Sequence, residues 1–260
     1  MFKSLSKALF TLAVLGGRAS ASAILFPMYI YPFAGTPCGG WTGVIDAIKA
    51  HQDLPFYLVI NPDSGPGPVN TQPNSDWTGC IPQLKNASSN VRVLGYVHTT
   101  YGHETESAVV ANITTYANWD TSYRPQGIFF DESPNDPGAN LTYMRTLASQ
   151  ARSSFSSDSP VVLNPGVAAD SGYYDFSTFI ITAENTYSAF STSQLSFSPS
   201  TPASKQAVVL HHGPTTTDAS LIQELVATDK IGAIFLTSEE YASIPTDWNN
   251  FVNLVAAASQ

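Results

Sequence analysis

Eight short runs of apolar, β-branched and aromatic residues recur along the chain, and a longer stretch that can form a helix follows most of them. The runs lack a strict alternation of apolar and polar residues, which is typical of parallel strands covered by helices on both faces. The expected strands span residues 24–31, 56–61, 91–99, 127–131, 161–164, 179–184, 207–212 and 231–237, and the expected helices span 41–52, 77–87, 104–119, 139–155, 218–228 and 247–257. Eight such units predict an α/β fold, the (β/α)8 TIM-type barrel.

The interval between the fifth and sixth runs departs from this pattern. It has room only for a turn or a very short helix around residues 170–174, so we expect a shortened helical unit between strands 5 and 6. A doubly wound open sheet is the alternative fold, but the sequence has no G-x-G-x-x-G after the first run and no P-loop, the usual marks of nucleotide binding. No boundary for a second domain is visible, so residues 24–260 are expected to form one barrel domain.

Acidic side chains outnumber basic ones. The 260 residues include 20 Asp and Glu against 11 Lys and Arg, which gives a formal net charge of −9, and Lys and Arg do not cluster. Binding to phosphates needs a basic surface, so nucleic acid is not an expected partner. A neutral or cationic substrate fits this charge better.

The first residues have the pattern of a secretory signal peptide. Lys3 and Lys7 precede an apolar run over 8–15, and the sequence Ala19-Ser20-Ala21-Ser22-Ala23 offers two cleavage sites of the A-x-A kind. The run is too short to span a bilayer, which needs about 20 apolar residues, and no later segment is long enough. We therefore expect removal of residues 1–23 and secretion of the rest, either free or associated with a cell wall, without a membrane anchor.

Two further features agree with export. Asn86, Asn112 and Asn140 each begin an N-glycosylation sequon. The only cysteines, Cys38 and Cys80, form an even pair, which in an oxidising compartment predicts a disulfide that stabilises the fold by about 2–4 kcal/mol. A pair of free buried thiols is the alternative.

Polar residues close several of the apolar runs, at the end of a barrel where enzymes of this fold place their active sites. Asp131 and Glu184 are the strongest candidates for a pair of catalytic carboxylates, because each of them stands at the end of an apolar run. Two carboxylates facing a groove are the minimal machinery of glycoside hydrolysis: one protonates the leaving oxygen, and the other attacks C1 or activates water.

The two-residue period of a strand predicts how these side chains point. Along the fourth strand, Asp131 would share its face with Phe129, and Glu132 would begin to face away. Along the sixth strand, the same rule places Glu184 with Ile180 and Thr182. The carboxylates of Asp131 and Glu184 would then face each other across the mouth of the barrel.

Aromatic and polar side chains near the same strand ends are expected to bind a sugar, because flat rings stack on sugar faces and hydroxyls bond to them. The aromatic candidates are Tyr29, Tyr31, Tyr96, Tyr101, Trp41 and Trp77. We expect about half of these six to be packing residues. Trp41 and Trp77 are the first candidates for packing, since each stands at the start of an expected helix. The expected substrate contacts are Tyr29, Asn61, Asp63, Tyr96, His98, Asn164 and His211.

The histidines raise an alternative function. A zinc ion held by some of His98, His103, His211 and His212, together with Asp63 or Asp131, would make a metal-dependent deacetylase. No H-E-x-x-H or H-x-x-x-H pair is placed on a helix, so no metal and no cofactor are expected. A serine nucleophile is disfavoured because no G-x-S-x-G occurs.

Six motifs follow one another along the chain. They are PMYIYP at 27–32, INPDSGPG at 60–67, GYVHT at 95–99, GIFFDE at 127–132, NPG at 164–166 and EN at 184–185. In this order they resemble the spherulin-4, or spherulation-specific, family of fungal and slime-mould proteins. The resemblance covers nearly the whole chain after the expected signal peptide.

The resemblance implies a (β/α)8 glycoside hydrolase related to Sph3-type fungal enzymes, which cleave α-1,4-linked N-acetylgalactosamine stretches of the exopolysaccharide galactosaminogalactan. The family's acidic pair after the fourth strand matches Asp131 and Glu132, and its glutamate after the sixth matches Glu184. The expected protein is a monomeric endo-acting hydrolase with a polysaccharide substrate. The alternative is a secreted sugar-binding or spherulation structural protein on the same barrel, without turnover.

Overall fold

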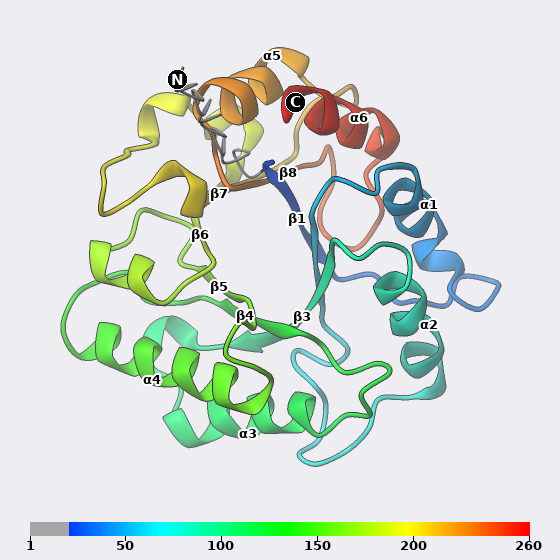
Figure 1. Cartoon of the computed structure of the whole chain (residues 1–260), viewed down its shortest axis with the longest axis vertical. Helices are drawn as coiled ribbons and strands as arrows, with labels where there is room; N and C mark the ends of the chain where they lie inside the picture. The colour runs from blue at the N-terminus through cyan, green and yellow to red at the C-terminus, as the bar shows by residue number, and fades with distance from the viewer. Residues whose placement is uncertain (1–20) are drawn as a thin grey trace, which may run out of the picture.

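The computed structural model describes residues 21–260, and its eight strands close into a parallel barrel in chain order, with β8 pairing with β1 (Figure 1). The strands are β1 (Ala23–Met28), β2 (Phe56–Ile60), β3 (Val91–His98), β4 (Gly127–Asp131), β5 (Val161–Asn164), β6 (Phe179–Thr186), β7 (Gln206–His211) and β8 (Ala233–Leu236). The TIM-type barrel predicted from the sequence is confirmed. The doubly wound alternative is wrong, because its open sheet would leave two edge strands unpaired.

The α-helices lie outside the ring of strands (Figure 1). They are α1 (Thr42–Ala50), α2 (Ser75–Lys85), α3 (Glu106–Ala117), α4 (Ala139–Ser154), α5 (Ala219–Ile222), which continues into the π-helical η7 (Gln223–Thr228), and α6 (Trp248–Ala258). Asn74, Thr105 and Asp218 cap the starts of α2, α3 and α5 with side-chain oxygens that accept backbone N–H groups.

The barrel lacks an α-helix in two of its units. Between β5 and β6 lies only the 3-10 helix η3 (Ser171–Asp175), which confirms the expected shortened unit. The connection from β6 to β7 holds only the short 3-10 helices η4 (Tyr187–Ala189), η5 (Thr192–Gln194) and η6 (Ala203–Lys205). Its Ser, Thr and Pro residues offer no apolar stripe that a helix could bury.

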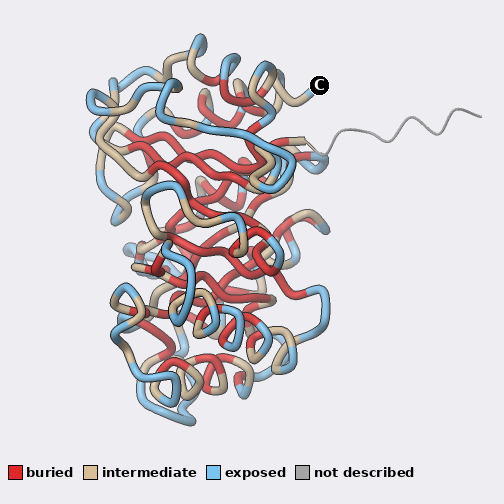
Figure 2. Tube along the Cα trace, turned by 90° about the vertical axis from the view of Figure 1, so that its left-hand side faces the viewer, coloured by how far each residue is buried: buried red, intermediate tan, exposed pale blue. Residues whose placement is uncertain are grey.

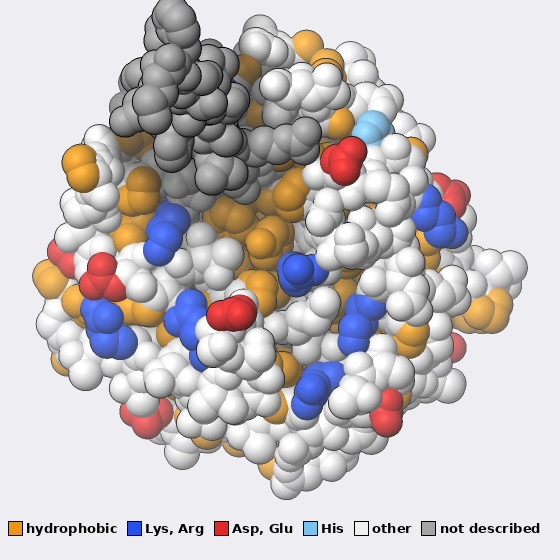
Figure 3. Space-filling view, in the orientation of Figure 1, with side chains coloured by type: hydrophobic (Ala, Val, Ile, Leu, Met, Phe, Trp, Pro, Cys, Tyr) orange, Lys and Arg blue, Asp and Glu red, His pale blue; other side chains and the backbone are white. Residues whose placement is uncertain are grey.

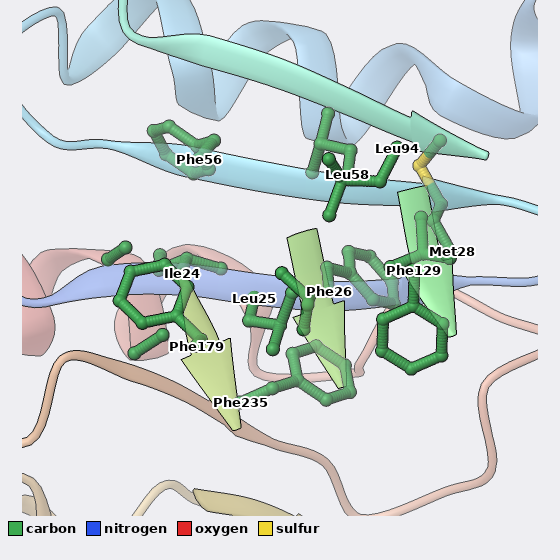
Figure 4. Close-up of a cluster of buried hydrophobic side chains, with 14 of the residues drawn as sticks. Ile24, Leu25, Phe26, Met28, Phe56, Leu58, Leu94, Phe129, Phe179 and Phe235 are labelled. Carbon is green, nitrogen blue, oxygen red and sulfur yellow. The ribbon is translucent and has the colours of Figure 1, made fainter. Parts of the chain in front are cut away.

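The strands form the buried centre of the molecule, and the exposed residues gather on the outer helices and loops (Figure 2). Phe26 of β1 stacks on Phe235 of β8 with ring centroids 4.4 Å apart, within the apolar cluster of Figure 4. Trp41 and Trp77 are buried and pack edge to face at 5.4 Å, which confirms them as packing residues. This dry core fixes the strand ends on which the functional side chains stand.

A disulfide joins Cys38, in the loop after β1, to Cys80 of α2, as the sequence predicts. It ties the short 3-10 helix η1 (Gly39–Trp41) and the start of α1 to the neighbouring helix. The bridge closes a separation of 42 residues along the chain.

Several basic side chains lie at the end of the barrel where strands begin. Lys and Arg side chains gather on the face seen in Figure 3, where strands begin and helices end. Arg92 is the second residue of β3, Lys85 ends α2, and Lys205 immediately precedes β7. Among residues 21–260, none of the Lys or Arg side chains forms a salt bridge with the carboxylates that end β4 or lie on β6.

Most of the expected signal peptide lies outside the described residues. Within its last positions, Ala23 begins β1, and the buried Ser22 donates its hydroxyl to the carbonyl of Ile231 at 2.6 Å. The barrel therefore begins slightly before residue 24. In the part of the chain that the structure describes, no helix has the length and apolar character needed to cross a bilayer.

Candidate active site at the carboxyl ends of the strands

Two neighbouring strands hold the carboxylate of Asp131 where β4 ends. Tyr96 of β3 donates its hydroxyl to Oδ2 at 2.7 Å, and Asn164, the last residue of β5, donates its amide to Oδ1 at 2.8 Å. Asn164 is the register partner of Asp131, so the barrel itself brings the two side chains together. Both carboxylate oxygens thus have a fixed donor.

Glu184 of β6 is held in the same way from the other side. The amide of Asn164 donates to its Oε2 at 2.6 Å, and the hydroxyl of Tyr241, in the loop after β8, donates to Oε1 at 2.6 Å. Asn164 therefore bridges the two carboxylates, and its own side-chain oxygen accepts the backbone N–H of Gly166 at 3.1 Å. The bridge is made of one amide with all its polar atoms bonded.

A β-bulge at Thr182 directs Glu184 to this place. The pairing of β6 with β7 skips Thr182, so Glu184 shares the face of Ile181. The prediction that Glu184 lies on one face with Ile180 and Thr182 is wrong, because it assumed an unbroken two-residue period. Thr182 instead donates its hydroxyl to the buried Gln206 at 2.9 Å.

Glu132 reaches the mouth of the barrel as well, against the prediction that it faces away. Its backbone is left-handed, with φ of 46°, which breaks the alternation of the strand directly after Asp131. The carboxylate lies 2.7 Å from Nε2 of His98. Thr99 donates its hydroxyl to the Asp131 and Glu132 carbonyls, and the Tyr101 N–H donates to the Glu132 carbonyl at 2.6 Å, so the neighbouring loop stabilises this turn.

Three tyrosines surround the carboxylates. The Tyr29 ring meets the rings of Tyr96 and Tyr241 edge to face, with centroids 5.6 and 5.9 Å apart. Burial, followed by the charge of Asp131, raises the pKa of both Tyr29 and Tyr96, and burial followed by Glu184 raises the pKa of Tyr241. At neutral pH the hydroxyls of Tyr96 and Tyr241 are therefore protonated donors to the two carboxylates.

The Asn164 bridge limits how far apart the carboxylates lie. Oδ1 of Asp131 and Oε2 of Glu184 both bond to the same nitrogen, so they are separated by at most about 5.4 Å, the sum of 2.8 and 2.6 Å. Retaining glycosidases place their two carboxyl groups about 5–5.5 Å apart, whereas inverting ones leave about 6.5–9.5 Å for a water. The upper bound of about 5.4 Å lies below the separations of inverting enzymes.

The remaining predicted substrate contacts differ in how close they lie to the two carboxylates. Asn61 accepts the backbone N–H of Gly65 at 2.8 Å and shapes the loop after β2, while Asp63 lies in that loop and its N–H bonds to the Gly65 carbonyl at 3.2 Å. His211 ends β7, and its ring packs against Tyr241 with centroids 6.0 Å apart. The structure thus brings Tyr29, Tyr96, His98, Asn164 and His211 to the carboxylates or their immediate neighbours, and gives Asn61 a local role in a turn.

Tyr241 is a site residue that the sequence interpretation missed. It follows the eighth strand by a few residues, in the loop that also holds Glu239 and Glu240. The sequence does hold a signal, because the loop after every strand of a barrel opens at the same end and Tyr241 stands in the polar segment that follows the eighth strand. The aromatic residues Tyr31 and Tyr101 are 48% and 54% exposed, so both rings are free to meet a ligand.

Comparisons with known proteins find a family model and relatives that match most of the chain. A family model described as spherulation-specific family 4 matches residues 23–255. Spherulin-4 of Physarum polycephalum is 28% identical over 222 residues, which cover 82% of this chain and only 62% of that relative. The crystal structure of Aspergillus clavatus Sph3 in complex with GalNAc matches with a TM-score of 0.82 and 35% identity over 92% of this chain and 99% of that one.

A more distant structure shares the architecture alone. A chitinase from Rhizomucor miehei matches with a TM-score of 0.56 and 12% identity, over 90% of this chain and 99% of the chitinase. At that identity the likeness shows the barrel fold alone.

Proposed function

The chain belongs to spherulation-specific family 4, and from this premise we propose that it is a secreted, endo-acting glycoside hydrolase with a two-carboxylate mechanism. The observation that carries the proposal is the amide of Asn164, bonded at once to Asp131 and Glu184. The proposed substrate is a polymer with α-1,4-linked N-acetylgalactosamine and galactosamine stretches, of the galactosaminogalactan kind.

The stereochemistry of this substrate requires a nucleophile from the protein. In an α-linked 2-acetamido sugar, the acetamido group and the leaving oxygen lie on the same side, so the acetamido oxygen cannot attack C1 from behind. Asp131 takes that role in our proposal, with Glu184 as acid and base. The separation of at most about 5.4 Å between their bridged oxygens supports a retaining reaction.

The reaction then has two steps. Asp131 attacks C1 while Glu184 gives its proton to the departing glycosidic oxygen, which leaves a sugar ester on Asp131 and a carboxylate on Glu184. In the second step Glu184 takes a proton from water, the water oxygen attacks C1, and the ester bond to Asp131 breaks. Glu132 supports the site from the rim, where it pairs with His98.

The fixed donors around the carboxylates prepare them for these steps. Tyr96 and Asn164 hold Asp131 in one orientation, and Tyr241 holds Glu184. Donors that are already in place when charge develops need no reorganisation during the reaction. No Lys or Arg in the described part of the chain is paired with these carboxylates, which suits a neutral or cationic sugar.

The bound ligand of the similar Sph3 structure supports the choice of sugar. That structure contains GalNAc, and its likeness extends over nearly the whole described chain. Secretion is supported by the leader pattern over residues 1–23 and by the sequons at Asn86, Asn112 and Asn140, of which Asn86 is exposed at the end of α2. We propose N-glycosylation at these positions and activity as a monomer.

The decisive experiment follows soluble oligosaccharides by mass spectrometry. The secreted protein is incubated with galactosaminogalactan and with an unrelated β-glucan, beside the variants Asp131→Asn and Glu184→Gln. We expect oligomers of several sizes from the first polymer only, and their loss in both variants. A folded wild-type protein that binds the polymer and releases nothing would instead identify a sugar-binding protein.

Two further measurements assign the individual roles. Proton NMR of the first product should show the α-anomer, whereas a β-anomer would contradict a covalent intermediate on Asp131. Azide should restore turnover to an alanine variant of the acid and base, Glu184→Ala, with an activated aryl glycoside as substrate, and should yield a glycosyl azide. If azide instead rescued only Asp131→Ala and gave a glycosyl azide of retained anomer, the assigned roles would be exchanged.

A further inference from the structure

A second cluster of chemically active side chains stands beside the carboxylates, and the proposed hydrolysis does not use it. His211 ends β7, His212 follows it, and Glu240 comes from the loop after β8. One ligand atom of each lies within 4.8 Å of the others, so the three side chains converge on one small volume. All three are open to solvent to some degree, with side-chain exposures of 22%, 55% and 62%.

The backbone is bent out of its usual range to make this convergence. Consecutive residues of a strand point to opposite faces, so His212 would ordinarily turn away from His211. His212 instead has a left-handed backbone with φ of 53°, and the two imidazole rings lie with centroids 4.7 Å apart. Such a conformation is uncommon in a residue other than glycine, and it is concentrated at functional sites.

Two separations between the ligand atoms lie near those of a tetrahedral site, and Nδ1 of His211 also lies 2.5 Å from Nδ1 of His212, a contact that a bound ion would replace. Oε1 of Glu240 lies 3.3 Å from Nε2 of His212 and 3.9 Å from Nδ1 of His211. Bonds of about 2.0–2.2 Å to nitrogen and oxygen in a tetrahedral site separate neighbouring ligand atoms by about 3.3–3.5 Å. Small rotations of exposed side chains are enough to reach these values.

We propose that His211, His212 and Glu240 bind one borderline transition-metal ion, Zn²⁺ or Cu²⁺, with water completing its coordination. Two imidazoles and one carboxylate are the ligands that such ions prefer, whereas Ca²⁺ and Mg²⁺ select sets of oxygen ligands. The three side chains leave a position open to solvent, so the ion can enter and leave. This site is separate from the carboxylate pair and supplies no group to the proposed hydrolysis.

The site is nevertheless in contact with the proposed active site. The His211 ring packs against Tyr241, whose hydroxyl donates to Glu184 at 2.6 Å. Glu240 directly precedes Tyr241 in the chain, so an ion bound to Glu240 fixes the segment that carries this donor. Occupancy of the site by the metal therefore changes turnover, and this consequence, unlike the binding, rests on the proposed function.

Metal binding is measured directly, without reference to activity. The protein, freed of any histidine tag and dialysed against a chelator, is titrated with Zn²⁺ by calorimetry, and Cu²⁺ is added for electron paramagnetic resonance. We expect one ion per chain, no binding of Ca²⁺, and a copper spectrum with hyperfine splitting from two nitrogens. His212→Ala and Glu240→Gln should each weaken Zn²⁺ binding at least tenfold, while His103→Ala, at an exposed histidine outside the cluster, should not.

The experiments test metal binding and its effect on turnover separately. Unchanged Zn²⁺ affinity in both His212→Ala and Glu240→Gln, or a copper spectrum without two nitrogen ligands, overturns the site whatever the enzyme does. Where the site binds and the chain hydrolyses its polymer, Zn²⁺ should change kcat in the wild type and leave kcat of His212→Ala unchanged. A wild-type kcat that is insensitive to saturating Zn²⁺ would overturn the coupling through Tyr241.

Discussion

The side-chain nitrogen of Asn164 lies 2.8 Å from Oδ1 of Asp131 and 2.6 Å from Oε2 of Glu184, and it donates one hydrogen to each. A single neutral amide therefore separates two carboxylates that would otherwise repel each other. Its place at the end of β5, between the strands of the two acids, makes this contact a direct product of the barrel register. The spacing of the acids is set by the fold rather than by a flexible loop.

Replacement of Asn164 should therefore damage catalysis more than folding. A hydrogen bond to a charged group contributes about 1.5–3 kcal/mol, so Asn164→Ala is expected to lower kcat about 10- to 100-fold. The matched control is Asn135→Ala, which removes an amide bonded only to a loop carbonyl, that of Ala168. Equal kcat values for the two variants would show that the bridge has no part in turnover.

Removal of the hydroxyl of Tyr241 tests the second anchor of Glu184. Tyr241→Phe keeps the ring and its edge-to-face contact with Tyr29 but removes the donor to Oε1. We expect kcat to fall about tenfold, as for the loss of one hydrogen bond to a charged group, with little change in KM. Tyr187→Phe is the control, because its hydroxyl donates to Asp218, away from the carboxylate pair.

The buried tyrosines make stability depend on alkaline pH. Burial and nearby carboxylates raise the pKa of Tyr96 and Tyr241 in the folded protein, whereas the unfolded chain has the ordinary value of about 10. Below pH 10 both states hold the proton, so stability is unaffected. Above about pH 10 the unfolded chain loses protons that the folded chain keeps, and the free energy of unfolding falls as the pH rises.

Urea unfolding between pH 8 and pH 11 measures this dependence. The slope above pH 10 should be smaller in Tyr96→Phe and in Tyr241→Phe than in the wild type. Tyr123→Phe provides the comparison, because the Tyr123 hydroxyl donates to Gln72, away from the two carboxylates. A slope that stayed the same in both buried variants would show that other groups govern alkaline unfolding.

The disulfide should make a measurable contribution to stability. The loop that it closes predicts a loss of about 2–4 kcal/mol in the double variant Cys38→Ser, Cys80→Ser. Urea unfolding of the wild type with and without reductant gives the control, since the reduced wild type should match the double variant. A reduced wild type that remains as stable as the oxidised protein would assign any loss in the variant to packing.

Processing of the leader can be predicted from the first strand. Cleavage after Ala23 would remove the hydroxyl of Ser22 that bonds to Ile231, and also the N–H of Ala23 that donates to the Gly232 carbonyl at 2.8 Å. Cleavage at the earlier site, after Ala21, keeps both contacts. We expect the secreted protein to begin at Ser22, and the mass of its N-terminal peptide would show whether Ile24 is the first residue instead.

Much of the architecture could be predicted because apolar periodicity and strand length determine it. Strand β4 spans residues 127–131 as expected, and Asp131 and Asn164 could be placed at strand ends without any tertiary information. The direction of Glu184 toward the barrel mouth was predicted from an unbroken strand period that the structure does not have, and the direction of Glu132 was predicted wrongly. Both depend on local breaks of the strand period, a left-handed residue in one case and a bulge in the other, and tertiary contacts rather than residue type stabilise such breaks.

The bulge at Thr182 therefore has a testable role in placing Glu184. Thr182→Val keeps the extra residue and removes the hydroxyl that donates to Gln206, so we expect a loss of about 1 kcal/mol in stability and an unchanged kcat. Deletion of Thr182 removes the extra residue but keeps Ile181 opposite Ala207 and Glu184 opposite Val209, so Glu184 should stay on the inner face of the barrel and kcat should be largely retained. Circular dichroism and kcat would be measured for both variants, and a folded deletion variant without activity would show that pairing with β7 alone does not place the carboxylate.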